Sequence, residues 1–213
     1  MQIEFKQILP HPLREYPHAS NSIWGNDILI PAGKKVMLNA SSGKGKTTFT
    51  HLLYGLRKDY EGALIIDGKN PQSFTPDQWT DYRQKQMSVV FQDLQLFPDL
   101  SVRENLALKN NLTHTLTDEQ MKAMLDYVGI GDKWEQRLGL LSMGQQQRVA
   151  IIRSLCQPFT TLLMDEPFSH LDKENAHKCM DLINKRCDEL GAGFILTSLG
   201  DTHDFNYDLT LHL

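Results

Sequence analysis

Short apolar runs, each the length of a single strand, recur along the chain. The run at residues 2–9 alternates apolar and polar positions, and the run at 23–30 is closed by Pro31 and Gly33. Continuous apolar runs are typical of parallel strands covered on both faces. The predicted strands are residues 2–9, 23–30, 36–39, 63–66, 88–91, 160–164, 194–197 and 209–213. The pattern therefore predicts an α/β fold with a mainly parallel sheet and a small antiparallel sheet near the amino-terminal end.

Helical spacing dominates a continuous block in the middle of the chain. Three capping boxes, in which a Ser or Thr precedes a Glu or Gln by three residues, mark helix starts at Ser101, Thr117 and Ser142. Residues 174–190 predict one more long helix. We expect one domain over residues 1–213, in which an inserted helical subdomain at 92–157 divides an α/β core with its β subdomain, 1–91 and 158–213.

The stretch 36–56 places an apolar strand, a glycine-rich turn and an amphipathic helix in the order of a P-loop. The helical spacing continues to Leu56, and Arg57 and Lys58 then follow where the helix dipole favours cations. Backbone N–H groups of such a turn point at phosphate oxygens, Lys46 reaches the β and γ phosphates, and the Thr47 hydroxyl ligates Mg²⁺. The predicted ATP-binding residues here are Ala40, Ser41, Ser42, Gly43, Lys44, Gly45, Lys46, Thr47 and Thr48.

Ala40 stands where the pattern usually has its first glycine. An alanine held at positive φ costs about 1 kcal/mol, so either this dihedral is ordinary or the loop is compromised. The bland interpretation of the whole stretch is a turn that binds nothing. It is disfavoured because Lys46 and Thr47 have no packing role in such a turn.

Two adjacent carboxylates follow the apolar run at 160–164. Asp165, at the carboxyl end of a buried strand, is predicted to hold Mg²⁺ through water, and Glu166 to polarise an attacking water. Gln92 follows another buried strand and is predicted to coordinate the same ion or orient the same water. Taken alone, a glutamine after a strand is more often simply solvated.

The stretch 141–148 begins a helix whose amino end could receive a phosphate through Ser142, Gly144 and Gln145. One phosphate cannot need both this helix and the P-loop helix of the same chain. A second copy arranged head to tail resolves the conflict, because each ATP then lies between the P-loop of one subunit and the Ser142 helix of the other.

Composition and charge limit the classes of partner and the cellular compartment that the chain is expected to have. Lys and Arg number 22 against 26 Asp and Glu, and the net charge of −4 disfavours nucleic acid as a partner. The three cysteines, Cys156, Cys179 and Cys187, form no metal-binding or disulfide pattern, so buried thiols in a reducing compartment are expected. The chain lacks the pattern of a signal peptide and any run of about 18 apolar residues. These features predict a cytoplasmic polypeptide.

With these motifs in this order, the chain resembles the nucleotide-binding subunits of ABC (ATP-binding cassette) transporters from Tyr16 to Ser198. Residues 40–47 resemble the family's Walker A motif, Gln92 its Q-loop, 141–145 its signature, 162–166 its Walker B motif and 169–172 its D-loop. The resemblance implies that Tyr16 stacks on adenine, as against merely packing on the sheet. It further implies a homodimer or a dimer with a similar ATPase subunit, transmembrane permease partners, and a peripheral position on the cytoplasmic face of the membrane.

Within the family, residues 81–98 and the short length resemble the ATPases of lipoprotein-releasing and macrolide-exporting systems or of the related cell-division complex. Leu94, Leu96 and Phe97 form either an apolar surface for a partner's coupling helix or part of the helical core.

The resemblance is not complete. Met143 replaces a glycine of the signature, and Ser198 stands where the family has a histidine that contacts the γ phosphate. A serine donates a hydrogen bond but carries no charge. His203 would have to bend back to substitute, and is otherwise a loop histidine.

Three functions remain open. The first is an ATPase subunit in which Glu166, Gln92 and Ser198 serve hydrolysis. The second, motivated by Ser198, Met143 and Ala40, is a module that dimerises on ATP but hydrolyses slowly. The third, a P-loop kinase, is disfavoured because such enzymes have no use for the signature.

Overall fold

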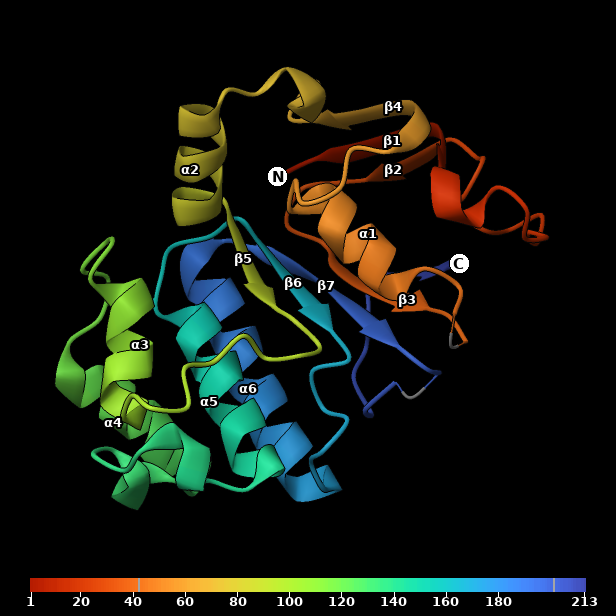
Figure 1. The fold of residues 1–213 in the computed structure, drawn as a ribbon. Coiled ribbons are helices and arrows are strands. Elements are labelled where there is room, and N and C mark those ends of the chain that lie inside the picture. Colours follow the sequence, from red (N-terminus) through yellow and green to blue (C-terminus); the bar gives the residue numbers. More distant parts are fainter. Residues whose placement is uncertain (42, 201) are drawn as a thin grey trace.

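A computed structural model describes residues 1–41, 43–200 and 202–213 and contains two sheets (Figure 1). The larger sheet is parallel throughout, as predicted. In spatial order its strands are β5 (Met87–Val90), β6 (Thr161–Asp165), β7 (Gly193–Ser198), β3 (Lys35–Asn39) and β8 (Leu209–His212). All five of these strands coincide, within one or two residues at each end, with apolar runs of the sequence.

The smaller sheet is antiparallel and has the order β2-β1-β4, which confirms the second sheet predicted. Its strands are β1 (Ile3–Pro10), β2 (Ile28–Ile30) and β4 (Tyr60–Ile66). The prediction of a strand over 23–30 was wrong in its first half, where Trp24 and Gly25 lie in a turn. The apolar side chains Ile23 and Trp24 are buried there without being part of a ladder.

Six α-helices and four 3₁₀ segments connect the strands of the described chain. The α-helices are α1 (Lys46–Leu53), α2 (Pro76–Lys85), α3 (Val102–Asn110), α4 (Asp118–Tyr127), α5 (Met143–Leu155) and α6 (Lys173–Leu190). The 3₁₀ segments are η1 (His11–Leu13), η2 (Pro71–Ser73), η3 (Gly131–Lys133) and η4 (Leu138–Leu140). The three predicted capping boxes all form, each with both of its hydrogen bonds. Within the described residues, no helix combines the length and the apolar character needed to cross a membrane.

Helix α1 is shorter than its hydrophobic spacing predicts. It ends at Leu53, and Gly55 at φ +72° turns the chain where a Cβ would lie 2.3 Å from the Trp79 ring. Leu56 is consequently 54% exposed, outside the helix. Arg57, expected where the helix dipole favours cations, lies four residues past the end of α1, and its side chain pairs with Asp59, with Nε 2.6 Å from Oδ1.

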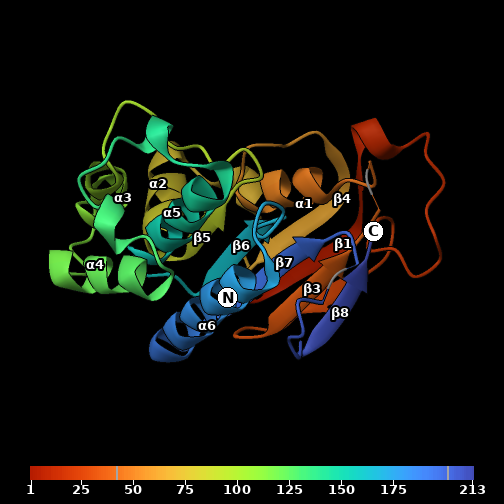
Figure 2. The same cartoon turned by 90° about the horizontal axis from the view of Figure 1, so that it is seen from below.

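The parallel sheet divides two hydrophobic cores. One core joins helices α3–α6 to the side chains that β6 and β7 direct to that face, among them Leu162 and Phe194. The other joins α1, α2 and the antiparallel sheet to the opposite side chains, including Leu163 and Ile195. Figure 2 shows α6 on one face of the parallel sheet and α1 on the other. All five residues of β6 are buried, because both faces of this strand are covered.

Candidate nucleotide site

The sequence-predicted site residues gather at the carboxyl ends of three strands of the parallel sheet. β3 leads into the glycine-rich turn, β6 ends at Asp165, and β7, which lies between them, ends at Ser198. The register pairs Asp165 with Thr197 and Asn39 with Ser198. Because parallel strands end at one edge, three distant segments of the sequence meet there, as ligand sites in open α/β sheets do.

The turn after β3 has the backbone expected of a phosphate-binding loop. Gly43 and Gly45 have φ of +78° and +100°, conformations that favour glycine, and Gly45 is the N-cap of α1. Ala40 is not among the described residues of positive φ, so its replacement of a glycine carries no strain of this kind. The predicted binding residue Ser42 lies outside the described residues.

Lys46 is buried at the start of α1 and its ammonium group is held by oxygens of its own chain. Nζ donates to the carbonyl oxygens of Ala40, at 3.1 Å, and Ser41, at 3.3 Å. It also forms an ion pair with Glu166, with Nζ 3.2 Å from Oε1, and the two side chains are 7% and 17% exposed. The lysine of the loop thus contacts the carboxylate predicted to activate water.

Three oxygen donors converge beside this pair. The Thr47 hydroxyl donates to Asp165 Oδ2 at 2.8 Å and lies 3.5 Å from Gln92 Oε1. Hydroxyl, carboxylate and amide oxygens are the hard ligands that Mg²⁺ prefers, together with water and phosphate. The donor set therefore fits Mg²⁺ at the three residues predicted as its ligands.

Glu166 has φ +50°, a left-handed conformation that costs a non-glycine residue about 1 kcal/mol. Hydrogen bonds on both sides stabilise it. Its N–H lies 3.3 Å from both the carbonyl and the hydroxyl oxygen of Thr197, and its carbonyl accepts from Gln147 Nε2 at 3.3 Å. The Thr197 hydroxyl also donates to Asp165 Oδ1 at 2.7 Å.

Sequence reasoning missed these two supporting residues. Thr197 was predicted only as part of an apolar strand, and Gln147 only as part of the stretch 141–148 that contains the signature. Both are 1% exposed. The signal that could have found them is a polar residue on a buried strand or on the buried stripe of a helix, since such a side chain requires a hydrogen-bond partner.

The signature segment lies at a different place. The Ser142 hydroxyl accepts from the Gln145 N–H at 3.3 Å, and the Gln145 side chain accepts from the Ser142 N–H at 2.9 Å, while Gly144 lies in the first turn of α5. Met143 beside them is 51% exposed. In Figure 1 the amino ends of α1 and α5 lie apart, with the segment after β6 between them.

Gln147 connects the two places. Besides Glu166 it contacts the D-loop, where its Nε2 lies 3.1 Å from Ser169 Oγ and its Oε1 accepts from the His170 N–H at 2.9 Å. A single buried amide thus fixes the start of the signature helix relative to the carboxylate after β6.

The remaining predicted residues surround this arrangement. Tyr16 lies after η1 and is 58% exposed, and Thr48 follows Thr47 in the first turn of α1. Ser198 is buried, and its carbonyl accepts from the Ala40 N–H at 3.1 Å. The His203 ring packs edge-on against Phe168, with ring centroids 4.8 Å apart.

The apolar residues after Gln92 separate into two groups. Leu94 is buried in the helical core and Leu96 packs against that core, whereas Phe97 is 52% exposed. Beside them lies a group of cations, Arg83, Lys109 and Arg153. Arg153 donates to the carbonyl oxygens of Leu94 and Gln95 at 2.8 and 2.7 Å. Burial, and then the charges of Arg153 and Arg83, lower the pKa of Lys109.

The three cysteines are buried free thiols, as expected from their spacing. Burial raises the pKa of each, of Cys156, Cys179 and Cys187 alike, to about 12. Thiols of this kind stay protonated and unreactive at neutral pH.

Comparisons with known proteins agree with this geometry. A thiamine import ATP-binding protein, ThiQ of Haemophilus influenzae, is 35% identical over 175 residues, which cover 81% of this chain and 79% of that protein. The lipoprotein-releasing system ATP-binding protein LolD of Shewanella denitrificans is 29% identical over 185 residues, 84% of this chain and 77% of that protein. The similarity therefore extends to import and release systems alike.

Among solved structures, the dimeric bacterial ABC transporter cassette MJ0796 superposes with a TM-score of 0.82 at 25% identity, covering 99% of this chain and 94% of that one. The family model described as ABC transporter matches residues 26–169. This match spans more than half of the chain and includes the glycine-rich loop, the signature and both carboxylates, and on it the chain belongs to the ABC transporter family.

Proposed function

We propose that the chain is an ATP-binding subunit of an ABC transporter, which binds and hydrolyses Mg-ATP to drive transport by membrane-spanning partners. The observation that carries the proposal is the convergence of four side chains at one sheet edge. Lys46 Nζ lies 3.2 Å from Glu166 Oε1, and Thr47 Oγ1 lies 2.8 Å from Asp165 Oδ2. A lysine, a hydroxyl and two carboxylates in this arrangement suit phosphoryl transfer to water.

Binding of ATP changes the partner of Lys46. A nucleotide's β and γ phosphates compete with Glu166 for the lysine ammonium, because both are anions at the same cation. When the phosphates pair with Lys46, the Glu166 carboxylate is released at the position where it can accept a proton from water. The Lys46–Glu166 ion pair thus keeps the base occupied until the substrate arrives.

A bound Mg²⁺ would neutralise negative charge on the nucleotide's phosphates. Thr47, Asp165 and Gln92 would hold it. Thr197 fixes one oxygen of Asp165 at 2.7 Å and leaves the other directed at Thr47. Ser198 at the end of β7 offers a hydroxyl to the transferred phosphoryl group in place of the family's histidine.

Two copies of the chain complete the site. Residues 92–157, proposed as the helical subdomain, present Ser142, Gly144 and Gln145 at the exposed start of α5, where N–H groups and the positive end of the helix dipole favour a phosphate. In a head-to-tail dimer these groups meet the γ phosphate held by the other subunit's Lys46, and Tyr16 stacks on that nucleotide's adenine. The solved cassette MJ0796, which this chain resembles in fold, is dimeric, and this supports a dimer.

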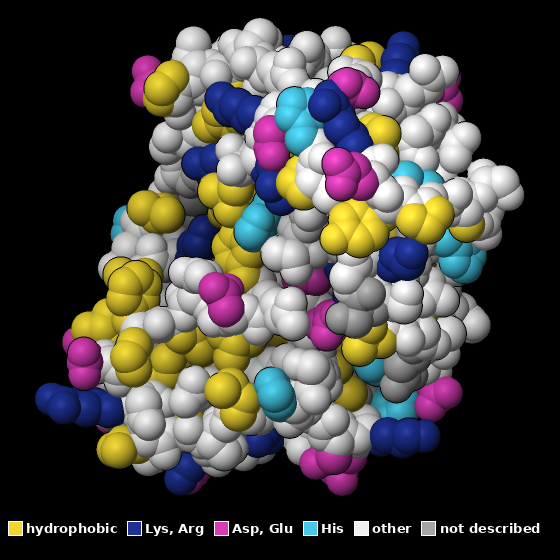
Figure 3. Space-filling model, turned by 45° about the vertical axis from the view of Figure 1, so that its right-hand side comes forward, with side chains coloured by type: hydrophobic (Ala, Val, Ile, Leu, Met, Phe, Trp, Pro, Cys, Tyr) yellow, Lys and Arg dark blue, Asp and Glu magenta, His cyan; other side chains and the backbone are white. Residues whose placement is uncertain are grey.

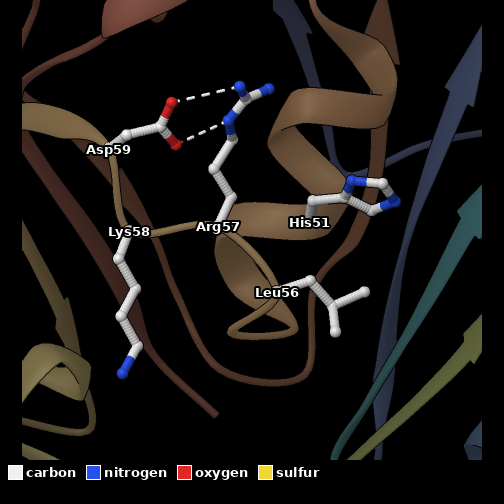
Figure 4. Close-up of a pocket in the computed structure, with 5 residues that line it drawn as sticks. All are labelled: His51, Leu56, Arg57, Lys58 and Asp59. Atoms are coloured by element: carbon white, nitrogen blue, oxygen red, sulfur yellow. Dashed lines mark hydrogen bonds and ion pairs between the residues drawn. The ribbon is translucent and has the colours of Figure 1, made fainter.

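We further propose that a membrane-spanning partner docks beside α1 and α3. Figure 3 shows hydrophobic side chains gathered on the helical side of one face. The exposed apolar residues of this region are Leu56, Phe97, Leu108 and Leu112. A hollow at the end of α1 adjoins it, and Figure 4 shows Arg57 turned toward Asp59 while Lys58 extends the other way. The cations Arg83, Lys109 and Arg153 favour a partner segment that carries a carboxylate.

Steady-state phosphate release tests the function, with Glu166→Gln as the paired variant. The wild-type chain is expected to release phosphate from Mg-ATP, and the variant to lose about 10³-fold in kcat while still binding ATP. A wild-type chain that does not bind Mg-ATP would contradict the proposal.

A second candidate, motivated by Ser198 and Met143, is a module that closes on ATP but hydrolyses it slowly. Equal rates for the wild type and Glu166→Gln would favour this module, since the carboxylate would then contribute nothing to turnover.

A further inference from the structure

Trp24 lies next to the phosphate-binding loop, although it comes 20 residues before Lys44 in the sequence and belongs to none of the motifs described above. Its side chain is 2% exposed and packs edge-on against Phe5, with ring centroids 6.5 Å apart, and Phe5 in turn stacks on Phe49 of α1 at 5.5 Å. The backbone around it is fixed, because the Trp24 N–H donates to Ser22 Oγ at 3.1 Å and the Gly25 N–H to the carbonyl oxygen of Ile8 at 2.8 Å. The indole is therefore held rigidly on the side of the loop that faces the protein.

The indole N–H donates to the loop itself, to the carbonyl oxygen of Lys44 at 3.1 Å. The described chain contains no cis peptide bond, so the Lys44 C=O and the Gly45 N–H of the same planar peptide point in opposite directions. A hydrogen bond that draws the carbonyl toward Trp24 consequently turns the Gly45 N–H away from Trp24. That N–H belongs to the amide groups that a loop of this kind directs at phosphate.

The ring also limits the space at Gly45. A Cβ on this residue would lie 2.7 Å from Leu13 Cδ1 and 3.2 Å from Trp24 Nε1. Gly45 has φ +100° and is the N-cap of α1, so its position determines where α1 and Lys46 begin. Trp24 and Leu13 together restrict the position of Gly45 and leave no room for a side chain there.

We propose that Trp24 is a positioning residue for nucleotide binding: its indole N–H orients the Lys44–Gly45 peptide so that the Gly45 amide is directed at the phosphates before the nucleotide arrives. The inference rests on the proposed ATP-binding function. Loss of the indole N–H leaves the part-buried Lys44 carbonyl without this donor and frees the peptide to rotate, and nucleotide binding must then order it again.

Trp79 provides a matched control. It is also buried, at 7% exposure, and packs against Phe74 and Tyr82 beside α2, but its indole N–H has no hydrogen-bond partner. Replacement of either tryptophan by phenylalanine removes the same atoms from a hydrophobic core. Only the change at Trp24 removes a hydrogen bond to the loop.

Isothermal titration calorimetry with Mg-ADP on the wild type, Trp24→Phe and Trp79→Phe tests the proposal. We expect Kd to rise about fivefold for Trp24→Phe, the effect of one neutral hydrogen bond, and to stay within twofold of the wild type for Trp79→Phe. In steady state, KM for ATP should rise by a similar factor with kcat nearly unchanged, because the contact serves bound substrate and transition state alike.

An unchanged Kd for Trp24→Phe, together with a lowered Tm, would overturn the proposal and leave Trp24 as a core residue only. If Trp24→Phe does not fold, the double variant Trp79→Phe, Trp134→Phe retains Trp24 as the sole tryptophan. Its fluorescence emission maximum should stay unchanged at saturating Mg-ADP, with binding verified by calorimetry, because the indole N–H already holds the loop peptide; a shifted maximum would show that the contact rearranges on binding and would contradict the proposal. A wild-type chain that fails to bind Mg-ADP would instead refute the nucleotide function itself.

Discussion

The glycine-rich loop and the signature segment both present a helix amino end, but they differ in what surrounds it. At α1, Lys46 is 7% exposed and is bonded to two carbonyl oxygens and Glu166 of its own chain. At α5, the side chains of Ser142 and Gln145 each accept a hydrogen bond from the other's backbone N–H, and Met143 and Leu140 beside them are 51% and 72% exposed. One helix end is enclosed by its own chain and the other faces outward.

This difference indicates how each half of the proposed site, the glycine-rich loop and the signature segment, is arranged for its ligand. The loop is arranged before any partner arrives, because Trp24, Glu166 and Ala40 hold it from within the chain. The signature has a satisfied cap and packs on one side against His170, but Met143 and Leu140 beside it are exposed apolar side chains, as at a surface that meets another molecule. The proposed head-to-tail dimer gives the outward helix end its ligand.

Ser142→Asp, at the outward helix end, separates the two roles of this serine. Aspartate caps a helix as well as serine, so the free energy of unfolding should change by less than about 1 kcal/mol. Its charge would repel the nucleotide phosphates of the other subunit, and turnover should fall at least about 100-fold with loss of the ATP-dependent dimer.

Size-exclusion chromatography with the hydrolysis-deficient Glu166→Gln background measures the dimer, and Mg-ADP titration of the Ser142→Asp monomer serves as the control. Unaltered dimerisation in the double variant would show that the outward helix end is not an interface.

Ser198→Ala examines the enclosed side. If the hydroxyl contacts the transferred phosphoryl group, kcat should fall about 10²-fold with little change in Kd for Mg-ADP, since a contact to the γ phosphate is absent from ADP. Measuring both quantities distinguishes this from a general loss of folding, which would lower kcat and raise the apparent Kd for Mg-ADP together. A kcat within twofold of the wild type would mean that hydrolysis proceeds without Ser198.

Lys109→Glu tests the proposed docking region. Reversal of this charge should weaken association with the membrane partner about tenfold, because the Arg83 and Arg153 cations would then be partly neutralised by the chain itself. Lys122→Glu, the same change at an exposed residue of α4, is the matched control. Copurification of the partner at two salt concentrations gives the measurement, and equal recovery with both variants would exclude this region as the docking surface.

The smallest expected effect is on stability at high pH, and it comes from the three cysteine thiols, which in the described part of the chain do not contact either helix amino end. With Cys156, Cys179 and Cys187 raised to a pKa of about 12 from an ordinary 9, the folded chain holds protons that the unfolded chain loses. This contribution to stability is fully present below pH 9 and declines as the pH rises from 9 toward 12. A thiol-specific reagent at pH 8 should label none of the three in the folded protein and all three in denaturant; rapid labelling of folded protein would contradict their burial.

The sequence predicted the fold well where local signals and burial agree. The buried strands β6 and β7 follow continuous apolar runs of the sequence, β8 follows an alternating one, and the three capping boxes correctly mark the starts of α3, α4 and α5. The end of α1 was misplaced because the deciding contact, Gly55 against Trp79, joins two elements that the spacing of Leu56 does not report.

The same distinction holds for the candidate site. Lys46, Thr47, Asp165 and Glu166 belong to recognisable patterns, and their mutual contacts follow from the parallel sheet. Thr197, Gln147 and Trp24 act through hydrogen bonds to residues between 19 and 32 positions away, among them Asp165, Glu166 and Lys44. No periodicity or spacing encodes such bonds, so they emerge only when the chain is folded.

Strands of the parallel sheet contribute side chains to both hydrophobic cores, and this limits where the chain can be cut into separately folding parts. Helices α3, α4 and α5 complete their interior with Leu162, Phe194 and other strand residues that come later in the chain. A fragment limited to residues 92–157 would expose that interior to water and is not a self-sufficient module. Transplantation of these helices into another cassette would have to preserve the contour of the receiving strands as well as the helices themselves.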